Sequence, residues 1–132
     1  MGITAISFHP ERPVVAVGSY DESLTLWDAR FPRRPLLEAE AEATEGGGVW
    51  RLKWHGRNKD KLLVACMHAG YRVFDMCGDG ESLEWSKTYH GEHNSLAYGA
   101  DWAPANGDDG DDTFLAATCS FYDNTLSFWS FK

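Results

Sequence analysis

The sequence predicts an all-β fold built from repeated units, and two observations support this. The first is a repeated hairpin pattern: a Tyr-Asp turn is followed by a Trp six positions after the Asp, at Asp21 to Trp27 and again at Asp123 to Trp129. The second is the alternation of apolar and polar side chains between each turn and its Trp, which is typical of half-buried strands. The same hairpin therefore occurs at least twice.

The first unit begins with two predicted strands, 3–8 and 14–18, separated by a His-Pro sequence. The strand that ends near Trp27 follows them. Segment 36–43 is rich in Glu and Ala, which favour helix, whereas the repeat requires a fourth strand here. We interpret this segment as an irregular edge strand.

The second and third units follow the same order less regularly. After the glycines at 46–48, the second unit has predicted strands over 49–55, 61–67, 71–76 and 83–89. The third unit begins with a predicted strand over 95–102. An acidic loop at 105–113 interrupts the third unit, and we interpret it as a solvated insertion. The expected units are thus 1–45, 46–92 (a degenerate copy) and 93–132.

An aromatic residue closes the first strand of each unit, at Phe8, Trp54 and Trp102, with spacings of 46 and 48 residues. Units slightly longer than 40 residues, with four strands and a turn Asp followed by a Trp, resemble the blades of WD-repeat β-propellers. Three blades cannot close a ring, because propellers have about four to eight. The predicted fold class is therefore a WD-repeat β-propeller, three blades of a ring of about seven, whose missing N-terminal blades are expected partners.

The resemblance also implies a hydrogen-bonded set in each blade, made of a His, a Ser or Thr, the turn Asp and the Trp. Ser19 occupies the hydroxyl position in the first unit. In the third unit His93 matches, but Phe121 stands where the hydroxyl is expected two positions before Asp123.

Composition narrows the function classes. The net charge of −8 argues against a general binder of nucleic-acid phosphates. Three cysteines, at positions 66, 77 and 119, lack both metal-ligand spacing and even pairing, which favours a reduced protein. No apolar run is long enough to span a membrane, and residues 1–20 lack a secretion signal pattern. We expect a cytoplasmic protein with no nucleic-acid or membrane partner.

Familiar catalytic and metal-binding motifs are missing. His90 and His93 are too close for the helical zinc spacing, and they occupy a predicted loop. The glycines at 46–48 precede a strand and not a helix, which argues against a phosphate site. The acidic loop lacks the ligand spacing of a calcium site. No metal and no cofactor are expected.

Four longer segments are more specific than the generic repeat, at 46–55, 65–70, 94–102 and 117–123. They resemble the C-terminal part of the WD-repeat diphthine methyl ester hydrolases of diphthamide biosynthesis. The resemblance implies an enzyme, a carboxylic ester hydrolase that removes a methyl ester from the modified histidine of translation elongation factor 2. The alternative is a non-catalytic WD-repeat scaffold for protein–protein interaction, which is the common use of the fold.

Candidate catalytic residues come from the rim of the propeller. In a WD-repeat propeller, the loop before each first strand and the loop between the second and third strands open on the same rim, which places His68, His93 and Ser95 there. A near-neutral histidine could activate a water or a hydroxyl for ester hydrolysis. The alternative for His93 is the blade-stabilising histidine. Cys66 and Cys119 are poorer nucleophiles, because burial in strands would raise the pKa of their thiols.

Candidate substrate-binding residues are the aromatic side chains of the same rim, Trp50, Tyr98, Phe121 and Tyr122. The resemblance implies a substrate with a trimethylammonium group, which cannot donate a hydrogen bond and is selected by aromatic faces. Phe121 is the most informative, because it stands in place of a structural hydroxyl. The alternatives are that Phe121 fills space between blades and that Trp50 is a core aromatic residue.

Overall fold

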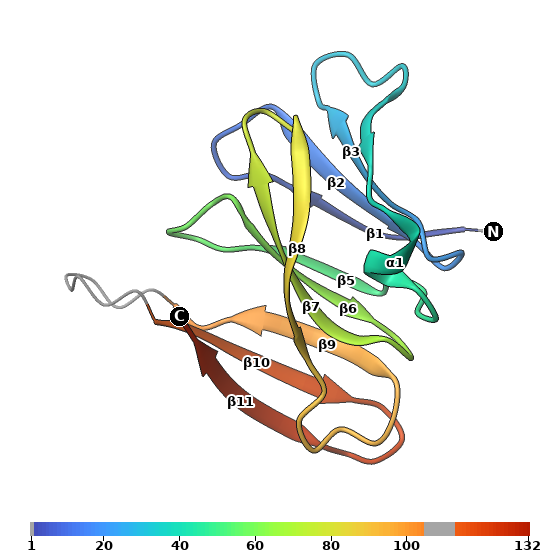
Figure 1. Ribbon diagram of the computed structural model, residues 1–132, viewed down its shortest axis with the longest axis vertical. Helices are drawn as coiled ribbons and strands as arrows, with labels where there is room; N and C mark the ends of the chain where they lie inside the picture. The colour runs from blue at the N-terminus through green and yellow to red at the C-terminus, as the bar shows by residue number, and fades with distance from the viewer. Residues whose placement is uncertain (1, 105–112) are drawn as a thin grey trace.

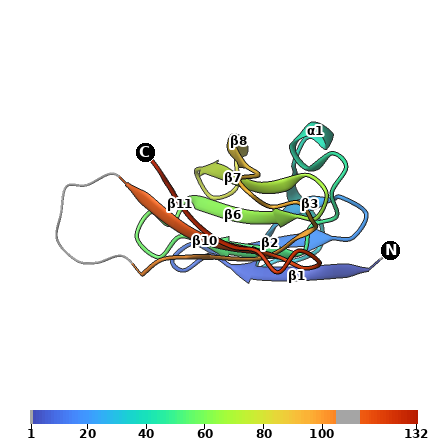
Figure 2. The same cartoon turned by 90° about the horizontal axis from the view of Figure 1, so that it is seen from below.

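Three antiparallel sheets follow one another in chain order, as Figures 1 and 2 show for the described residues, 2–104 and 113–132. The first contains β1 (Ile3–Phe8), β2 (Val14–Ser19), β3 (Leu24–Asp28) and β4 (Pro35–Glu38). The second contains β5 (Arg51–Trp54), β6 (Lys61–Cys66), β7 (Gly70–Cys77) and β8 (Ser82–Tyr89). The third contains β9 (Ala97–Trp102), β10 (Phe114–Ser120) and β11 (Leu126–Phe131). This architecture confirms the predicted fold class of a partial propeller.

Strands β6 and β7 of the second sheet are buried on both faces. One core cluster lies between the first and second sheets and includes Leu24, Leu62 and Phe74. The other lies between the second and third sheets and includes Leu63 and Trp102. Burial on both faces explains why β6 is a continuous apolar run, whereas strands with one solvated face alternate.

Neighbouring sheets are joined by hydrogen bonds that recur at equivalent positions. The indole nitrogen Nε1 of Trp54 donates to the carbonyl oxygen of Ser7 (3.1 Å), and Nε1 of Trp102 donates to the carbonyl oxygen of Lys53 (2.8 Å). Each acceptor precedes the aromatic residue that closes the first strand of the previous sheet. A partly buried bond of this kind contributes about 1 kcal/mol. The recurring aromatic residue is therefore a docking residue between blades.

The segment that we interpreted as an irregular edge strand, 36–43, is only partly a strand. β4 pairs with β3 as far as Glu38, and the short helix α1 (Ala41–Thr44) follows. No side chain caps the start of α1, but Arg72 Nη1 donates to the carbonyl oxygens of Glu42 (2.8 Å) and Ala43. A tertiary contact with β7 therefore fixes this helical turn.

The outer faces of the first and third sheets expose large apolar side chains. Ile6 and Phe8 on β1 are 62% and 69% exposed, and Leu126 and Phe128 on β11 are 63% and 69% exposed. The same faces of the second sheet are covered by its neighbours. This exposure is expected of a partial propeller whose end blades lack neighbours.

Candidate functional site

A chain of hydrogen bonds links five side chains in the third sheet: Trp129, Thr118, His93, Ser120 and Asp123. Trp129 Nε1 lies 3.1 Å from Thr118 Oγ1, which lies 2.9 Å from His93 Nε2. His93 Nδ1 lies 2.7 Å from Ser120 Oγ, and Ser120 in turn donates to the carboxylate of Asp123. The chain therefore runs without interruption from an indole to a carboxylate.

The two ends of this chain determine the direction of its bonds. An indole only donates, and an ionised carboxylate only accepts. The Ser120 hydroxyl, followed by the backbone N–H of Asn94, lowers the pKa of Asp123 to about 2. Ser120 uses its proton on Asp123 and so accepts from His93 Nδ1, which therefore carries a proton. The ring is neutral when Nε2 accepts from the Thr118 hydroxyl at 2.9 Å.

The environment of His93 favours this neutral form. Burial lowers the pKa of its imidazole, and the nearby charge of Asp123 opposes that shift. Both ring nitrogens are engaged within the sheet, and the ring packs against Tyr71 at 5.0 Å between centroids. This geometry is that of the blade-stabilising alternative.

The expectation that Phe121 replaces a structural hydroxyl was wrong, because Ser120 supplies that hydroxyl to Asp123. The turn is one residue longer than its counterpart in the first sheet. There the backbone N–H of Ser19 donates to the carbonyl of Ser23 (3.0 Å), whereas here Ser120 donates to Thr125 (3.0 Å). Phe121 is the additional residue before the Tyr-Asp pair.

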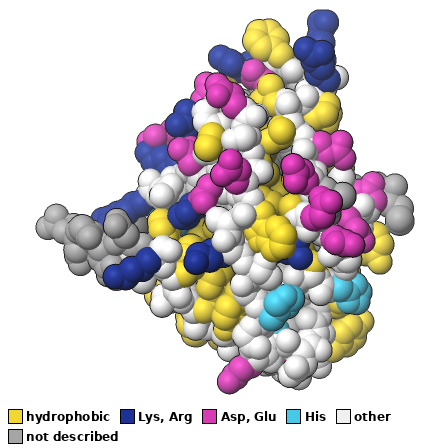
Figure 3. Space-filling model, in the orientation of Figure 1, with side chains coloured by type: hydrophobic (Ala, Val, Ile, Leu, Met, Phe, Trp, Pro, Cys, Tyr) yellow, Lys and Arg dark blue, Asp and Glu magenta, His cyan; other side chains and the backbone are white. Residues whose placement is uncertain are grey.

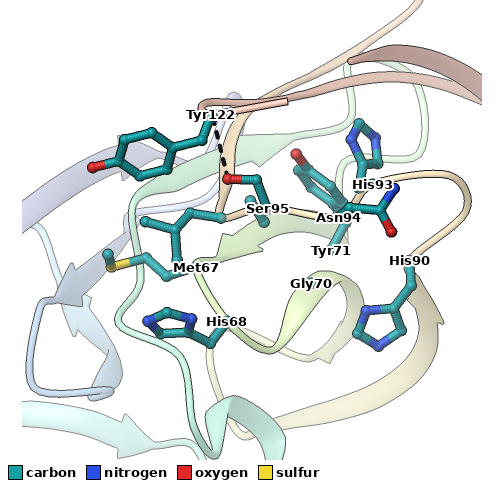
Figure 4. Close-up of a pocket in the computed structure, with 11 residues that line it drawn as sticks. Met67, His68, Gly70, Tyr71, His90, His93, Asn94, Ser95 and Tyr122 are labelled. Atoms are coloured by element: carbon teal, nitrogen blue, oxygen red, sulfur yellow. Dashed lines mark hydrogen bonds between the residues drawn. The ribbon is translucent and has the colours of Figure 1, made fainter. Parts of the chain in front are cut away.

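A pocket of about 500 Å³ opens between the second and third sheets (Figure 4). It brings together four of the predicted site residues, His68, His93, Ser95 and Tyr122. Ser95 Oγ accepts a hydrogen bond from the backbone N–H of Tyr122 (3.1 Å). Among the described residues, Ser95 forms no hydrogen bond with a histidine, so Ser95 is not paired with a base for nucleophilic attack. The serine that does bond a histidine is Ser120, whose proton is used on Asp123.

The wall of the pocket depends on Gly70. Its φ of +82° lies in the left-handed region, and a Cβ added there would lie 2.7 Å from the ring of His90. Figure 4 shows His68 and His90 on different sides of this glycine. None of the residues that line the pocket is Lys or Arg. The pocket therefore presents imidazole, hydroxyl and amide groups without a fixed positive charge.

The four predicted substrate-binding residues form a continuous set that we name the aromatic row: Trp50, Tyr98, Phe121 and Tyr122. Successive ring centroids are 4.8, 4.9 and 4.9 Å apart. Trp50 and Tyr98 are half-buried, whereas Phe121 and Tyr122 are exposed. Tyr122 also lines the pocket, so the row and the pocket form one continuous surface. In Figure 3 the lower part of the molecule, over the third sheet, carries mostly uncharged side chains.

The two cysteines that we judged to be poor nucleophiles differ in their environments. Burial raises the pKa of the Cys66 thiol to about 12, as expected. Cys119, in contrast, is exposed, because it lies on the outer face of the third sheet. The expectation that both are buried was therefore wrong for Cys119.

Two structural histidines were missed from the sequence. His9 Nδ1 accepts the backbone N–H groups of Glu11 and Arg12, at 3.1 and 2.9 Å. His55 Nδ1 accepts those of Arg57 and Asn58, at 3.1 and 2.8 Å. In the first and second units the last residue of the first strand is aromatic and the next is His, a repeated pair that could have identified them.

No metal-binding group of three or more His, Cys, Asp or Glu side chains was found in the described part of the chain. The acidic loop predicted at 105–113 lies outside the described residues from 105 to 112. Across residues 2–104 and 113–132, no helix has the length and apolarity needed to cross a membrane.

Comparisons with known proteins agree with the fold. The model of the family "WD domain, G-beta repeat" matches residues 1–28. Together with the three sheets, this match shows that the chain is part of a WD-repeat β-propeller.

Similarity to curated proteins extends over nearly the whole chain. The "Diphthine methyltransferase homolog" of Dictyostelium discoideum is 40% identical over 134 residues, 98% of this chain and 35% of that protein. The diphthine methyltransferase of Homo sapiens is 40% identical over 106 residues, 78% of this chain and 23% of that protein. That of Saccharomyces cerevisiae is 32% identical over 140 residues, 93% of this chain and 34% of that protein.

These names correct the predicted activity. The relatives are named methyltransferases, which denotes a transferase and contradicts the carboxylic ester hydrolase. Nor do the names favour the non-catalytic scaffold. The chain spans between about a quarter and a third of the length of these relatives.

Proposed function

We propose that this chain is part of a WD-repeat protein of the diphthamide pathway, which acts in the methyl-transferring step for which its relatives are named. The observation that carries the proposal is the similarity to the Dictyostelium protein, at 40% identity over 98% of this chain. The aligned region covers 98% of this chain and so spans the loops between strands, which carry function more often than the sheets that hold them.

The contribution of this chain is the surface that receives the modified side chain. The pocket has a volume of about 500 Å³, within the usual range for small-molecule sites. Its polar groups include His68, Ser95 and Asn94, which come from loops held in place by two packed sheets. A few polar groups in a preformed pocket fix the orientation of a ligand.

The partner in this proposal is translation elongation factor 2, whose modified histidine carries diphthine. A modified residue on a folded protein has to reach the enzyme from outside. The pocket suits this requirement because it is open to solvent between two blades and connects to the exposed aromatic row.

The test replaces the matching third of the yeast relative with residues 1–132 of this chain, which gives a yeast chimera. The chimera is expressed in cells that lack the yeast protein, and the mass of the modified histidine of elongation factor 2 is measured. The proposal expects the chimera to restore the methylated mass seen in wild-type cells. An unrestored mass with a folded, abundant chimera, or a net loss of a methyl group when the chimera is present, would contradict it.

A further inference from the structure

The additional residue in the turn between β10 and β11 adds an aromatic ring that the turn itself does not use. Ser120 and Thr125 close the turn by a backbone hydrogen bond of 3.0 Å, and Asp123 accepts the backbone N–H of Thr125 at 3.2 Å. The equivalent bonds exist in the shorter turn of the first sheet. Phe121 is 56% exposed and contacts the rings of Tyr98 and Tyr122.

The rings of the aromatic row come from two different blades. Trp50 lies just before β5 of the second sheet, and Tyr98 lies on β9 of the third. The ring planes are tilted by 45° between Trp50 and Tyr98, and by 33° between Tyr98 and Phe121. The rings are tilted and not stacked face to face, and the half-exposed Trp50 and Tyr98 lead to the exposed Phe121, so a ligand can reach this end of the row from solvent.

No cation of the described residues lies over the aromatic row. The two cation–π contacts of the described chain are elsewhere, with Lys61 5.0 Å from the ring centroid of Phe114 and Arg72 4.4 Å from that of Trp85. The adjoining pocket is not lined by Lys or Arg, and the chain has a net charge of −8. The exposed end of the aromatic row and the negative charge both favour a cation supplied by a ligand.

We infer that Trp50, Tyr98 and the inserted Phe121 bind a quaternary ammonium group, which in the substrate is the trimethylammonium of diphthine. The assignment to diphthine rests on the proposed function. A quaternary ammonium has no N–H to donate, so it is distinguished from other groups by its positive charge against aromatic faces. The site would thus select side chains that already carry the trimethylated amine, while the pocket holds the rest of the side chain.

The test measures binding of choline to the purified yeast chimera by ligand-observed NMR. A neutral isostere, in which carbon replaces the quaternary nitrogen, serves as the second probe. Three variants are compared: Phe121→Leu, Phe121→Tyr and, as the matched control on an exposed Phe far from the row, Phe31→Leu. Choline should bind in preference to its isostere, about fivefold more weakly in Phe121→Leu, and unchanged in Phe121→Tyr and Phe31→Leu.

Equal binding of the neutral isostere would show an apolar patch and would overturn the inference, as would unchanged choline affinity in folded Phe121→Leu. The readout does not depend on the methyl-transfer assay. Choline selectivity without restored methylation of elongation factor 2 therefore supports this site and removes the proposed function. Restored methylation without choline selectivity supports the proposed function and removes this site.

Discussion

The first and third sheets are built on the same hairpin, and their comparison separates structure from function. Each has a Ser at the start of the turn, an Asp within it and a Trp whose indole donates to a Thr hydroxyl. The acceptor is Thr25 for Trp27 in the first sheet and Thr118 for Trp129 in the third. Only the third sheet adds His93 and completes the chain from Trp129 to Asp123. Only the third also adds an exposed ring to the turn. What the sheets share stabilises a blade, and what differs points to recognition.

The largest effect should come from breaking the complete chain. Thr118 is 1% exposed and bonds both Trp129 and His93, so Thr118→Val should lower the free energy of unfolding by about 2–3 kcal/mol. Thr25, in contrast, is half-buried and accepts from the indole of Trp27, and the described residues give it no histidine partner. Thr25→Val should therefore lower the free energy of unfolding by only about 1 kcal/mol. Urea unfolding followed by tryptophan fluorescence measures both. Equal losses would mean that His93 adds nothing to the third blade.

A smaller loss is expected from the docking residue of the third sheet. Trp102→Phe copies the residue that the first sheet carries at Phe8 and removes the bond to the carbonyl of Lys53. The expected cost is about 1–2 kcal/mol, from the lost bond and part of the buried indole area. Urea unfolding is again the measurement. No loss of stability would show that docking depends on ring shape alone.

Stability should also fall as the pH drops below about 6.5. Burial is the largest cause that lowers the pKa of His9, His55 and His93 from the ordinary value of 6.5. The unfolded state therefore binds protons more readily, so stability is complete above pH 6.5 and declines as the pH falls toward the folded pKa values. Urea midpoints across this range measure the slope. His93→Gln should reduce the slope, and an unchanged slope would exclude His93 as a contributor.

The smallest effect should follow deletion of Phe121, which restores the turn length of the first sheet. Because Ser120, Asp123 and Thr125 can keep their bonds, the free energy of unfolding should change by less than about 0.5 kcal/mol. Circular dichroism during thermal unfolding provides the measurement. A loss as large as that of Thr118→Val would show that Phe121 fills structural space between blades.

The repeat made the fold predictable, because turn, alternation and period all recur around Trp27 and Trp129. The helix α1 was not predictable in the same way, since it depends on Arg72 from a strand about 30 residues away. Phe121 was misread as the residue that replaces a hydroxyl, because aligning Asp123 with Asp21 places Phe121 opposite Ser19. The structure shows that Ser120 closes the turn and that Phe121 is inserted after it. The direction of the hydrogen bonds around His93 could not be predicted from the sequence, because it depends on the positions of all five side chains of the chain.

The candidate site was predicted in its location but not in its chemistry. Loop positions brought His68, Ser95 and Tyr122 to one pocket and placed Trp50, Tyr98 and Phe121 in contact. The reaction was inferred from resemblance alone, and the names of the relatives contradict it. Nothing in the repeat pattern distinguishes a transferase from a hydrolase, because both would use the same loops of the same fold.

The position of the second sheet between two cores has a consequence for thermodynamic coupling. Leu62 and Leu63 are neighbours in sequence, yet they belong to different clusters on opposite faces. Substitutions at these two positions should have nearly additive effects, because they share few packing partners. Leu63 and Ala100, in contrast, are far apart in the chain but pack in one cluster, so a double-mutant cycle between them should give a nonzero interaction energy. Which residues are energetically coupled in this molecule therefore depends on how the blades stack and not on how close the residues are in sequence.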